Sequence, residues 1–210
     1  QQGREIRKAF IPSPGNVLVG ADYSQIELRL LAHMSQDERL TKAFLEETDI
    51  HTRTASEVFG IPVGEVDKFQ RNAAKAVNFG IIYGISDFGL ARNLGVTRAV
   101  AGAYIKKYLE RYPGVQEYMH RSVEEGRRLG YASTIFGRRR ELPELKSSNY
   151  NTRSFGERVA MNMPLQGSAA DIIKIAMNRV RERLLSGGYA SRLILQVHDE
   201  LIVDAAKSEA

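Results

Sequence analysis

The sequence of 210 residues contains no cysteine and no long apolar run. Without cysteine, a disulfide framework, a thiolate zinc site and a catalytic cysteine are excluded, and a reducing compartment is permitted. A membrane-spanning helix needs roughly 20 apolar residues, and no segment approaches that length. Hydrophobic residues make up 43% of the chain and charged residues 26%, which excludes wholesale disorder. The length allows one large domain or two small ones.

The charge is unevenly distributed along the chain. Lys and Arg number 30 against 25 Asp and Glu, so the net charge is +5. Residues 120–160 hold nine of the basic residues and five acidic ones, and therefore carry +4 of this total. Such a local excess suggests a polyanionic partner. The alternative is a solvated helix face with ordinary ion pairs, and the charge alone slightly favours this alternative.

Hydrophobic spacing and turn residues predict an α+β protein that is mostly helical. Residues 16–21 form a buried strand, and 131–138 a small hairpin. Residues 192–197 and 201–203 form a strand pair around a charged tip, which the strand at 16–21 joins in one small antiparallel sheet. The long helical segment 153–186 is expected to break at Met163-Pro164, because proline fits a helix's first turn but not its interior. The remaining helices are expected at 26–34, 38–46, 51–59, 66–83, 87–94, 98–111 and 115–129.

Two aspartates stand at the ends of predicted strands in matched settings. Asp22 follows the apolar run from Val17 to Ala21, and Asp199 follows the run from Leu193 to Val197. An ionised carboxylate beside apolar strands needs compensation, and a divalent cation such as Mg²⁺ prefers oxygen ligands. The alternative is that each aspartate caps a turn or a helix. The two interpretations are evenly balanced when both residues are considered.

The helix predicted at 66–83 carries a second constellation. Arg71, Lys75, Phe79 and Tyr83 are spaced by four and form one slowly winding stripe. Cations followed by aromatic rings suit a nucleotide, with the cations on its phosphates and a ring against its base. The alternative is an amphipathic helix whose aromatic residues are core and whose cations are solvated.

At this point the motifs resemble those of the family A DNA polymerases, the bacterial DNA polymerase I type. Residues 22–29 (DYSQIELR) are similar to motif A, residues 71–84 (RNAAKAVNFGIIYG) to motif B, and residues 196–200 (QVHDE) to motif C. Residues 134–140 (TIFGRRR) and 157–167 (ERVAMNMPLQG) also resemble family segments. Five motifs in order cover essentially the whole chain, which makes the resemblance specific.

The resemblance implies a right-hand polymerase fold, with a palm built on a small antiparallel sheet and helical fingers. Residues 1–35 and 131–210 would form the palm, and residues 36–130 the fingers. The activity implied is template-directed DNA synthesis, in which a dNTP adds a dNMP to a primer 3′-hydroxyl by two-metal-ion nucleotidyl transfer. The cofactors implied are two Mg²⁺ ions, with Mn²⁺ as a substitute.

The resemblance also assigns roles to individual residues. The metal ligands would be Asp22, Tyr23 and Asp199. Catalytic roles would fall to Asp22, Asp199, Lys75 as proton donor to pyrophosphate, and Glu200. The incoming nucleotide would be bound by Gln25, Glu27, His51, Arg71, Lys75, Phe79 and Tyr83, with Glu27 filling the space that a 2′-hydroxyl needs. Primer–template DNA would be contacted by Arg138, Arg158, Asn162, Gln166, Gln196 and His198.

The implied partners are primer–template DNA and dNTPs, for a monomeric cytoplasmic protein of bacterial or phage type associated with the nucleoid. The chain departs from the family pattern at Asn72, where a basic residue is common, and lacks the family's thumb. We therefore expect a palm and fingers portion of a polymerase. The alternatives are a weakly catalytic DNA-binding fragment that needs a thumb, and a two-metal nuclease or phosphatase, for which the stripe from Arg71 to Tyr83 would have no use.

Overall fold

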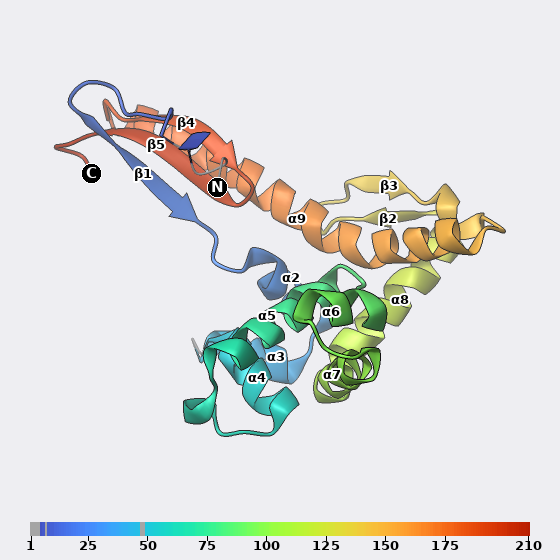
Figure 1. Ribbon diagram of the computed structural model, residues 1–210. Helices are drawn as coiled ribbons and strands as arrows, with labels where there is room; N and C mark the ends of the chain where they lie inside the picture. Colours follow the sequence, from blue (N-terminus) through green and yellow to red (C-terminus); the bar gives the residue numbers. More distant parts are fainter. Residues whose placement is uncertain (1–4, 7, 47–48) are drawn as a thin grey trace. The chain divides into compact units, whose positions relative to one another are not determined.

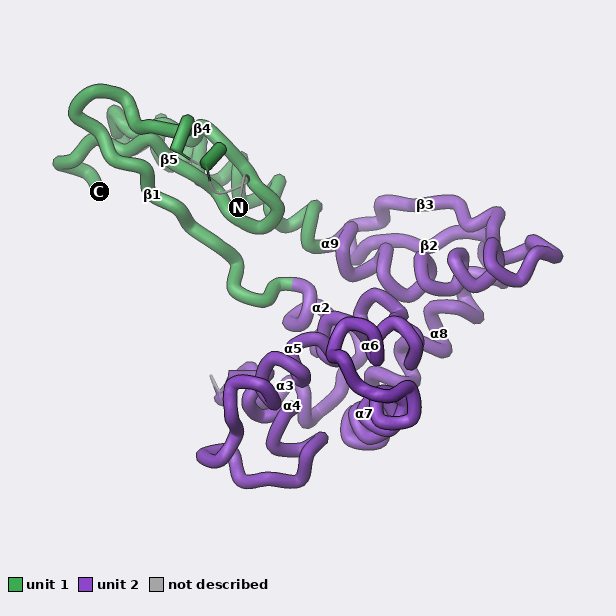
Figure 2. The backbone as a smooth tube through the Cα atoms, viewed as in Figure 1, with its two compact units in different colours: residues 1–26, 169–210 green, residues 27–168 purple. Residues whose placement is uncertain are grey.

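The computed structural model describes residues 5–6, 8–46 and 49–210, which form two compact units (Figure 2). Unit 1 combines residues 1–26 with 169–210, and unit 2 comprises residues 27–168. Helices dominate and the sheets are small and antiparallel, which confirms the α+β class. The predicted palm and fingers divide the chain at other positions, and that division stays a prediction. No helix in the described part of the chain has the length and apolar character to cross a membrane.

Unit 1 is built on a three-stranded antiparallel sheet in the order β1-β5-β4 (Figure 1). The strands are β1 (Asn16–Asp22), β4 (Arg192–Val197) and β5 (Glu200–Ala206). The register pairs Asn16 with Ala206 at one end and Asp22 with Glu200 at the other. The predicted meeting of strands from opposite ends of the chain is therefore confirmed.

The prediction that the strand at 16–21 is buried is wrong, and the strand that precedes Asp199 is largely exposed as well. The last four residues of β1 are exposed, and Ile194 and Val197 in β4 are 52% and 40% exposed. Within the sheet only Leu201 and Ala205 of β5 are buried. A sheet of three strands has two edges, and only its middle strand is flanked on both sides. The argument that Asp22 and Asp199 need a cation because they lie beside buried strands therefore does not hold.

Unit 2 begins with helices whose first residues follow capping side chains. Side chains of Asp37, Asp49, Asp67, Ser86 and Thr97 accept hydrogen bonds from backbone N–H groups in the first turns of successive helices. These helices are α3 (Glu38–Leu45), α4 (Ile50–Phe59), α5 (Lys68–Ile82), α6 (Asp87–Leu94) and α7 (Arg98–Arg111), preceded by α2 (Ile26–Ser35). The predicted helices thus exist, with ends that differ by a few residues.

The rest of unit 2 packs the small hairpin between helices. Helix α8 (Pro113–Leu129) leads into β2 (Tyr131–Ser133) and β3 (Arg139–Glu141), and a short 3₁₀ turn (Pro143–Lys146) precedes α9 (Tyr150–Ser186). The predicted hairpin is confirmed, but its second strand lies at 139–141, beyond the predicted range. An apolar cluster joins these elements, with Val123 and Met163 packed against its buried members Ala132, Leu142, Leu145, Val159 and Ala160.

The predicted break at Met163-Pro164 is wrong, because α9 is one helix of 37 residues with Pro164 inside it (Figure 1). Proline disturbs the preceding turn, where it removes a donor and crowds the carbonyls. In that turn the hydroxyl of Tyr118, from α8, donates to the carbonyl oxygen of Met161 at 3.0 Å. The carbonyl that Pro164 leaves without its helical donor is that of Ala160, four residues earlier, and the Tyr118 bond falls on the next carbonyl along the chain. Packing against α8 thus adds a donor in the disturbed turn, and the helix continues past the position where local sequence favours an end.

We predict that replacing Tyr118 with Phe lowers the free energy of unfolding by about 1–2 kcal/mol, because the Met161 carbonyl loses a buried partner. Denaturant unfolding followed by circular dichroism measures this change. Tyr104→Phe is the matched control, since the Tyr104 hydroxyl has no hydrogen-bond partner within the described residues. Equal effects of the two substitutions would show that the Tyr118 hydrogen bond does not support the helix.

Candidate functional site

The ends of β1 and of the β4–β5 hairpin bring the two predicted aspartates to one end of the sheet. Asp22 is the last residue of β1 and pairs in register with Glu200, the first residue of β5. Asp199 lies in the two-residue turn that connects β4 to β5. The backbone N–H of Tyr23 donates to the carbonyl oxygen of Asp199 at 3.1 Å. The two aspartates that the sequence places at strand ends therefore lie at the same end of one sheet.

Glu200 lies beside Asp22, and its carboxylate occupies the space next to Gly20, where there is no side chain. Directly paired residues of an antiparallel sheet project to the same face, so the side chains of Asp22 and Glu200 share one face. A Cβ atom placed on Gly20 would lie 2.5 Å from Oε1 of Glu200. Any larger residue at Gly20 would displace this carboxylate, so the glycine helps to define where Glu200 sits.

Strained backbone flanks both aspartates. Gln25 and His198 have φ values of 57° and 53°, and among the described residues only Gln36 is another non-glycine residue with positive φ. Left-handed backbone is uncommon for such residues and costs on the order of 1–3 kcal/mol when tertiary structure enforces it. The side-chain amide of Gln196 donates to the carbonyl oxygen of His198 at 2.7 Å and braces the turn. Strain of this kind is typical of functional sites.

The donor set at this sheet end fits a magnesium ion that shares its coordination with a substrate. In the described parts of the chain, Asp22 and Asp199 have no cationic partner, and no group of three or more His, Cys, Asp or Glu side chains is placed to hold a metal. The protein alone would supply two carboxylates here. Mg²⁺ is commonly held by one or two carboxylates together with waters and substrate phosphates. Tyr23, the third predicted ligand, follows Asp22 directly and is 44% exposed.

Helix α5 presents the predicted stripe on its accessible side. Asp67 and Gln70 form a capping box that starts the helix one turn before Arg71. The buried side is made by other residues: Ala73, Ala74, Val77, Asn78, Gly80, Ile81 and Ile82. Arg71 and Phe79 are half-buried, while Lys75 and Tyr83 are exposed. The alternative in which the two aromatic residues belong to the core is therefore wrong for Tyr83, and Phe79 is only partly covered.

His51 stands in the first turn of α4, against α5. Its side chain is buried, and its ring centroid lies 5.7 Å from that of Phe79. Burial lowers the pKa of His51 to about 4; the Asp49 carboxylate opposes this shift, whereas Arg71 and Lys75 add to it. His51 is consequently neutral at pH 7, and it joins the predicted nucleotide-binding residues of α5.

Asp49 is a residue of this site that the sequence analysis missed. It caps α4 by accepting from the backbone N–H of His51, and its Oδ2 accepts from Nε of Arg71 at 2.6 Å. Partial burial raises the pKa of Asp49, but the hydrogen bonds from Arg71, Thr52 and His51 outweigh it and bring the pKa to about 2. Because the contact uses Nε, it orients the guanidinium and leaves its two terminal nitrogens for a ligand. An aspartate at a helix start, two positions before His51, is the signal that could have revealed it.

Glu27 and Tyr83 form a direct contact between the motifs at 22–29 and 71–84. The hydroxyl of Tyr83, the C-cap residue of α5, donates to Oε2 of Glu27 at 2.8 Å. Glu27 lies in the first turn of α2. Sequence reasoning assigned both residues to the nucleotide without foreseeing this hydrogen bond, which restricts the position of the carboxylate.

Three predicted DNA contacts line one cavity of about 490 Å³ together with Tyr83. Arg158, Asn162 and Gln166 are spaced by four along α9 and so share one helix face. The Oδ1 atom of Asn162 is buried without a hydrogen-bond partner, which is unusual unless a ligand or water completes it. The cavity thus has a mixed lining, with Phe155, Val159 and Met163 beside these polar residues, and one of the residues that line it has a buried oxygen without a partner.

Close approach of the backbone shapes this cavity at Gly84. Gly84 has a φ of 62°, and a Cβ atom there would lie 2.8 Å from Cγ of Arg158. Nη1 of Arg158 donates to the hydroxyl of Ser154 at 3.1 Å. Only glycine meets both the conformation and the space required, and Arg158 therefore lies directly over the turn that follows α5.

The basic excess at 120–160 is only partly used in ion pairs. Arg127 pairs with Glu157, and Arg140 lies 4.0 Å from Glu144. Arg121 and Arg153 instead donate to backbone carbonyl oxygens. Arg138, the remaining predicted DNA contact, is exposed in the loop of the β2–β3 hairpin. Ordinary ion pairing therefore explains part of the charge, but not all of it.

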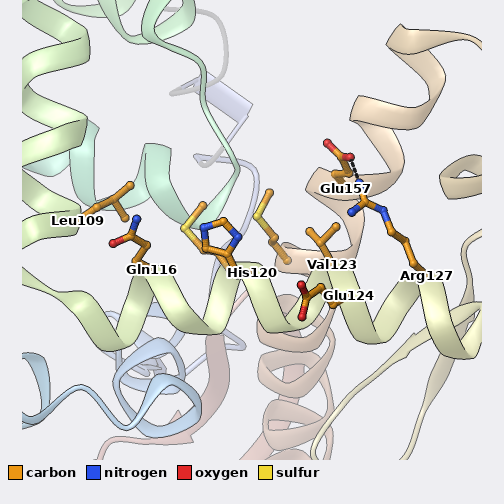
Figure 3. A pocket seen from close by; sticks show the side chains of 9 residues that line it. Leu109, Gln116, His120, Val123, Glu124, Arg127 and Glu157 are labelled. Carbon is orange, nitrogen blue, oxygen red and sulfur yellow. Dashed lines mark hydrogen bonds and ion pairs between the residues drawn. The ribbon is translucent and has the colours of Figure 1, made fainter.

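A further hollow of about 330 Å³ contains none of the predicted site residues (Figure 3). Leu109, Met119, Val123 and Met161 give it an apolar lining, and the Arg127–Glu157 ion pair lies at one end. His120 and Glu124 also line it, from successive turns of α8. Its position separates it from the α9 face that carries Arg158, Asn162 and Gln166.

We predict that His51 makes stability depend on pH between about 6.5 and 4. Its folded-state pKa of about 4 is below the unfolded value, so the unfolded chain binds more protons in this window and stability falls as pH falls. The loss is at most about 3 kcal/mol and is complete below pH 4. Denaturant unfolding of the wild type and of His51→Gln at a series of pH values measures the contribution of His51 to the free energy of unfolding.

His33→Gln, which replaces an exposed histidine on α2, is the control for this measurement. It should keep the pH dependence of the wild type, whereas His51→Gln should flatten it between pH 6.5 and 4. Parallel curves for the wild type and His51→Gln would contradict a buried, neutral His51.

Comparison with known proteins gives a consistent answer across the whole chain. The model of DNA polymerase family A matches residues 1–210. DNA polymerase I of Streptococcus pneumoniae serotype 4 is 56% identical over 211 residues, which cover 100% of this chain and 24% of that protein. DNA polymerase I of Bacillus subtilis is 56% identical over 210 residues, again covering 100% of this chain and 24% of the relative. The chain thus spans about a quarter of the length of these relatives.

A solved structure described as the POL domain of Pol1 from M. smegmatis in complex with DNA primer-template and dNTP superposes with a TM-score of 0.93. It is 45% identical in sequence, and the match covers 99% of this chain and 37% of that one. Fold, motif order and whole-chain identity agree with one another, and they show that this chain belongs to DNA polymerase family A.

Proposed function

We propose that this chain provides the nucleotide-adding centre of a DNA-directed DNA polymerase. The reaction joins the dNMP portion of a dNTP to a primer 3′-hydroxyl under direction of a template and releases pyrophosphate. The observation that carries the proposal is the pairing of β1 with β5, which sets Asp22 and Asp199 at one end of a sheet. A relative described with primer–template and dNTP bound supports the same substrates.

In this proposal Asp22, Tyr23 and Asp199 hold two Mg²⁺ ions, for which Mn²⁺ can substitute. When bound, the metals would lower the pKa of the primer hydroxyl and neutralise charge on the triphosphate. The protein's own task is to place these carboxylates at one sheet end, where the strained turns at Gln25 and His198 fix the chain. Glu200, on the same face as Asp22, would adjust the charge at the primer terminus.

The nucleotide is assigned to the surface formed by α4 and α5. Arg71, whose Nε is held by Asp49, would direct its terminal nitrogens to the phosphates, and Lys75 and His51 would donate to them as well. Lys75 would then give a proton to the departing pyrophosphate. Gln25 would contact the triphosphate, and Phe79 would lie against the sugar and base. Positioning and charge neutralisation are the main requirements of such a transfer.

The DNA is assigned to the face of α9 that lines the 490 Å³ cavity and to the turn after β4. Arg158, Asn162 and Gln166 would meet the template side, with Asn162 gaining the partner that its buried oxygen lacks. Gln196 and His198 would contact the primer, and Arg138 a phosphate. Minor-groove acceptors are shared by different base pairs, so such contacts test pair geometry without reading sequence.

We also propose that this chain is the palm and fingers portion of a longer polymerase and acts with a thumb that grips DNA. It spans 24% of the length of its relatives, which supports this interpretation. The alternative, a DNA-binding fragment with weak catalysis, makes a different prediction for the isolated chain. Primer extension by the chain alone, compared with the full-length polymerase that contains it, separates the two.

We predict that Asp22→Asn and Asp199→Asn each reduce primer extension by the full-length polymerase roughly 10³-fold or more, because a metal ligand is lost. Single-turnover extension with saturating dNTP and Mg²⁺ measures the rate, and a filter-binding assay should show that DNA affinity is retained. Glu182→Gln, at an exposed acid of α9, is the control and should extend normally. Near-normal extension by either aspartate variant would rule out the two-metal assignment.

We predict that Glu27→Ala raises ribonucleotide incorporation relative to deoxynucleotide incorporation by roughly 10- to 100-fold, because space for a 2′-hydroxyl opens. Tyr83→Phe should shift the same ratio by roughly 2- to 10-fold, since Glu27 loses the hydrogen bond that restricts it. Single-nucleotide kinetics with matched rNTP and dNTP measure both.

Glu65→Ala, which shortens an exposed glutamate in the 3₁₀ turn before α5, is the matched control. It should leave the ratio unchanged. A ratio that stays at the wild-type value in Glu27→Ala would place sugar selection elsewhere.

A further inference from the structure

A buried chain of polar side chains connects the interior of unit 2 to His51. The hydroxyl of Thr54 donates to Oδ1 of Asn78 at 3.2 Å, and Nδ2 of Asn78 lies 3.0 Å from Nδ1 of His51. The exposed fractions of Thr54, Asn78 and His51 are 0%, 0% and 3%. Thr54 and His51 belong to α4, and Asn78 to α5. The three groups therefore satisfy one another across the α4–α5 contact.

The direction of these hydrogen bonds fixes which nitrogen of His51 carries the proton. Because Thr54 donates to the amide oxygen, the NH₂ group of Asn78 faces the ring. An amide nitrogen can only donate, so Nδ1 of a neutral His51 must accept. The ring proton then resides on Nε2, the nitrogen on the other side of the ring.

The position of Asn78 is costly if its role is only to pack α5. Its buried neighbours on the helix are Ala73, Ala74, Val77 and Ile81, all apolar. A buried amide in a helix interior stabilises less than an apolar residue unless every one of its groups is partnered. What the amide adds at this position is a directed hydrogen bond to His51.

We propose that Asn78 is a positioning residue for nucleotide addition, which holds His51 in the tautomer that donates from Nε2 to a phosphate oxygen of the incoming dNTP. The proposal rests on the function proposed above. With Nδ1 facing the amide, the ring has one donor to offer, and it is directed away from Asn78. The opposite tautomer would present a lone pair to the phosphate and repel it.

The charged groups that face His51 are consistent with a neutral donor. Asp49, the N-cap of the same helix, lies two residues before it, and Arg71 and Lys75 face it from α5. Burial and the two cations keep the pKa of His51 low, so between pH 6 and 8 the ring is a donor without a charge. In this proposal Arg71 and Lys75 supply positive charge for the triphosphate, and His51 supplies one hydrogen bond of fixed direction.

The first test is the tautomer itself, read by long-range ¹H–¹⁵N correlation NMR in protein labelled with ¹⁵N-histidine. His51→Gln identifies the signal. In the wild type at pH 7 we expect Nε2 protonated and Nδ1 unprotonated; a proton on Nδ1 would overturn the proposal. Asn78→Asp replaces the donor with an acceptor of the same shape, and we expect it to move the proton to Nδ1. Thr54→Val, which frees the amide to turn, should give a mixture of the two tautomers.

The second test is nucleotide affinity as a function of pH in the full-length polymerase. In Asn78→Asp the carboxylate should raise the pKa of His51, so His51 is a donor at low pH and an acceptor from Nε2 at high pH. We expect the KM for dNTP to rise about tenfold from pH 6 to pH 8.5 in this variant, whereas that of the wild type stays flat. Asn93→Asp, which adds the same charge at an exposed position of α6, should behave as the wild type.

The two tests separate this inference from the proposed function. Expected NMR signals together with a pH-independent KM in Asn78→Asp would overturn the positioning role and leave the polymerase assignment standing. Failure of the wild-type enzyme to extend primers would overturn the polymerase assignment, and the positioning role with it, whatever the tautomer. If Asn78→Asp does not fold, the wild-type tautomer and Thr54→Val still decide, because either a proton on Nδ1 in the wild type or an unchanged tautomer in Thr54→Val contradicts the proposal.

Discussion

The two aspartates come from opposite ends of the chain, and the antiparallel pairing of β1 with β5 is what makes them neighbours. Asp22 pairs with Glu200, and the N–H of Tyr23 reaches the carbonyl oxygen of Asp199. A register shift of one residue would send the side chain of Asp22 to the other face of the sheet. The geometry of the candidate metal site therefore depends on backbone hydrogen bonds, and the left-handed residues Gln25 and His198 lie next to this sheet end.

The surface that we assign to the nucleotide depends on polar contacts between α4 and α5 that hold charged groups in place. Asp49 caps one helix and orients Arg71 on the other, while Asn78 links the helices through His51 and Thr54. Each of these contacts uses a side chain that also has a local structural contact, Asp49 as the cap of α4 and Asn78 as a buried partner of Thr54. Residues that stabilise unit 2 thus also determine the direction of the groups assigned to the triphosphate.

Two contacts near the candidate site restrict long charged side chains that would otherwise sample many conformations. Glu27 accepts from Tyr83, and Arg158 packs over Gly84, where a left-handed backbone and the lack of space for a Cβ atom together favour glycine. Both contacts lie beside the end of α5. A carboxylate and a guanidinium on a surface sample many rotamers, and fixing them in advance lowers the entropy lost when a ligand binds.

Sequence by itself determined the family, the helices and the strands, because apolar spacing, caps and motifs are local signals. The stripe from Arg71 to Tyr83 follows from helical geometry alone, and the ordered motifs at 22–29, 71–84 and 196–200 identified the family. Only tertiary structure decided the continuity of α9 at Pro164, where Tyr118 from another helix supplies a donor. It also decided the exposure of β1 and β4 and the contacts of Asp49 and Asn78, because burial and side-chain hydrogen bonds depend on residues distant in sequence.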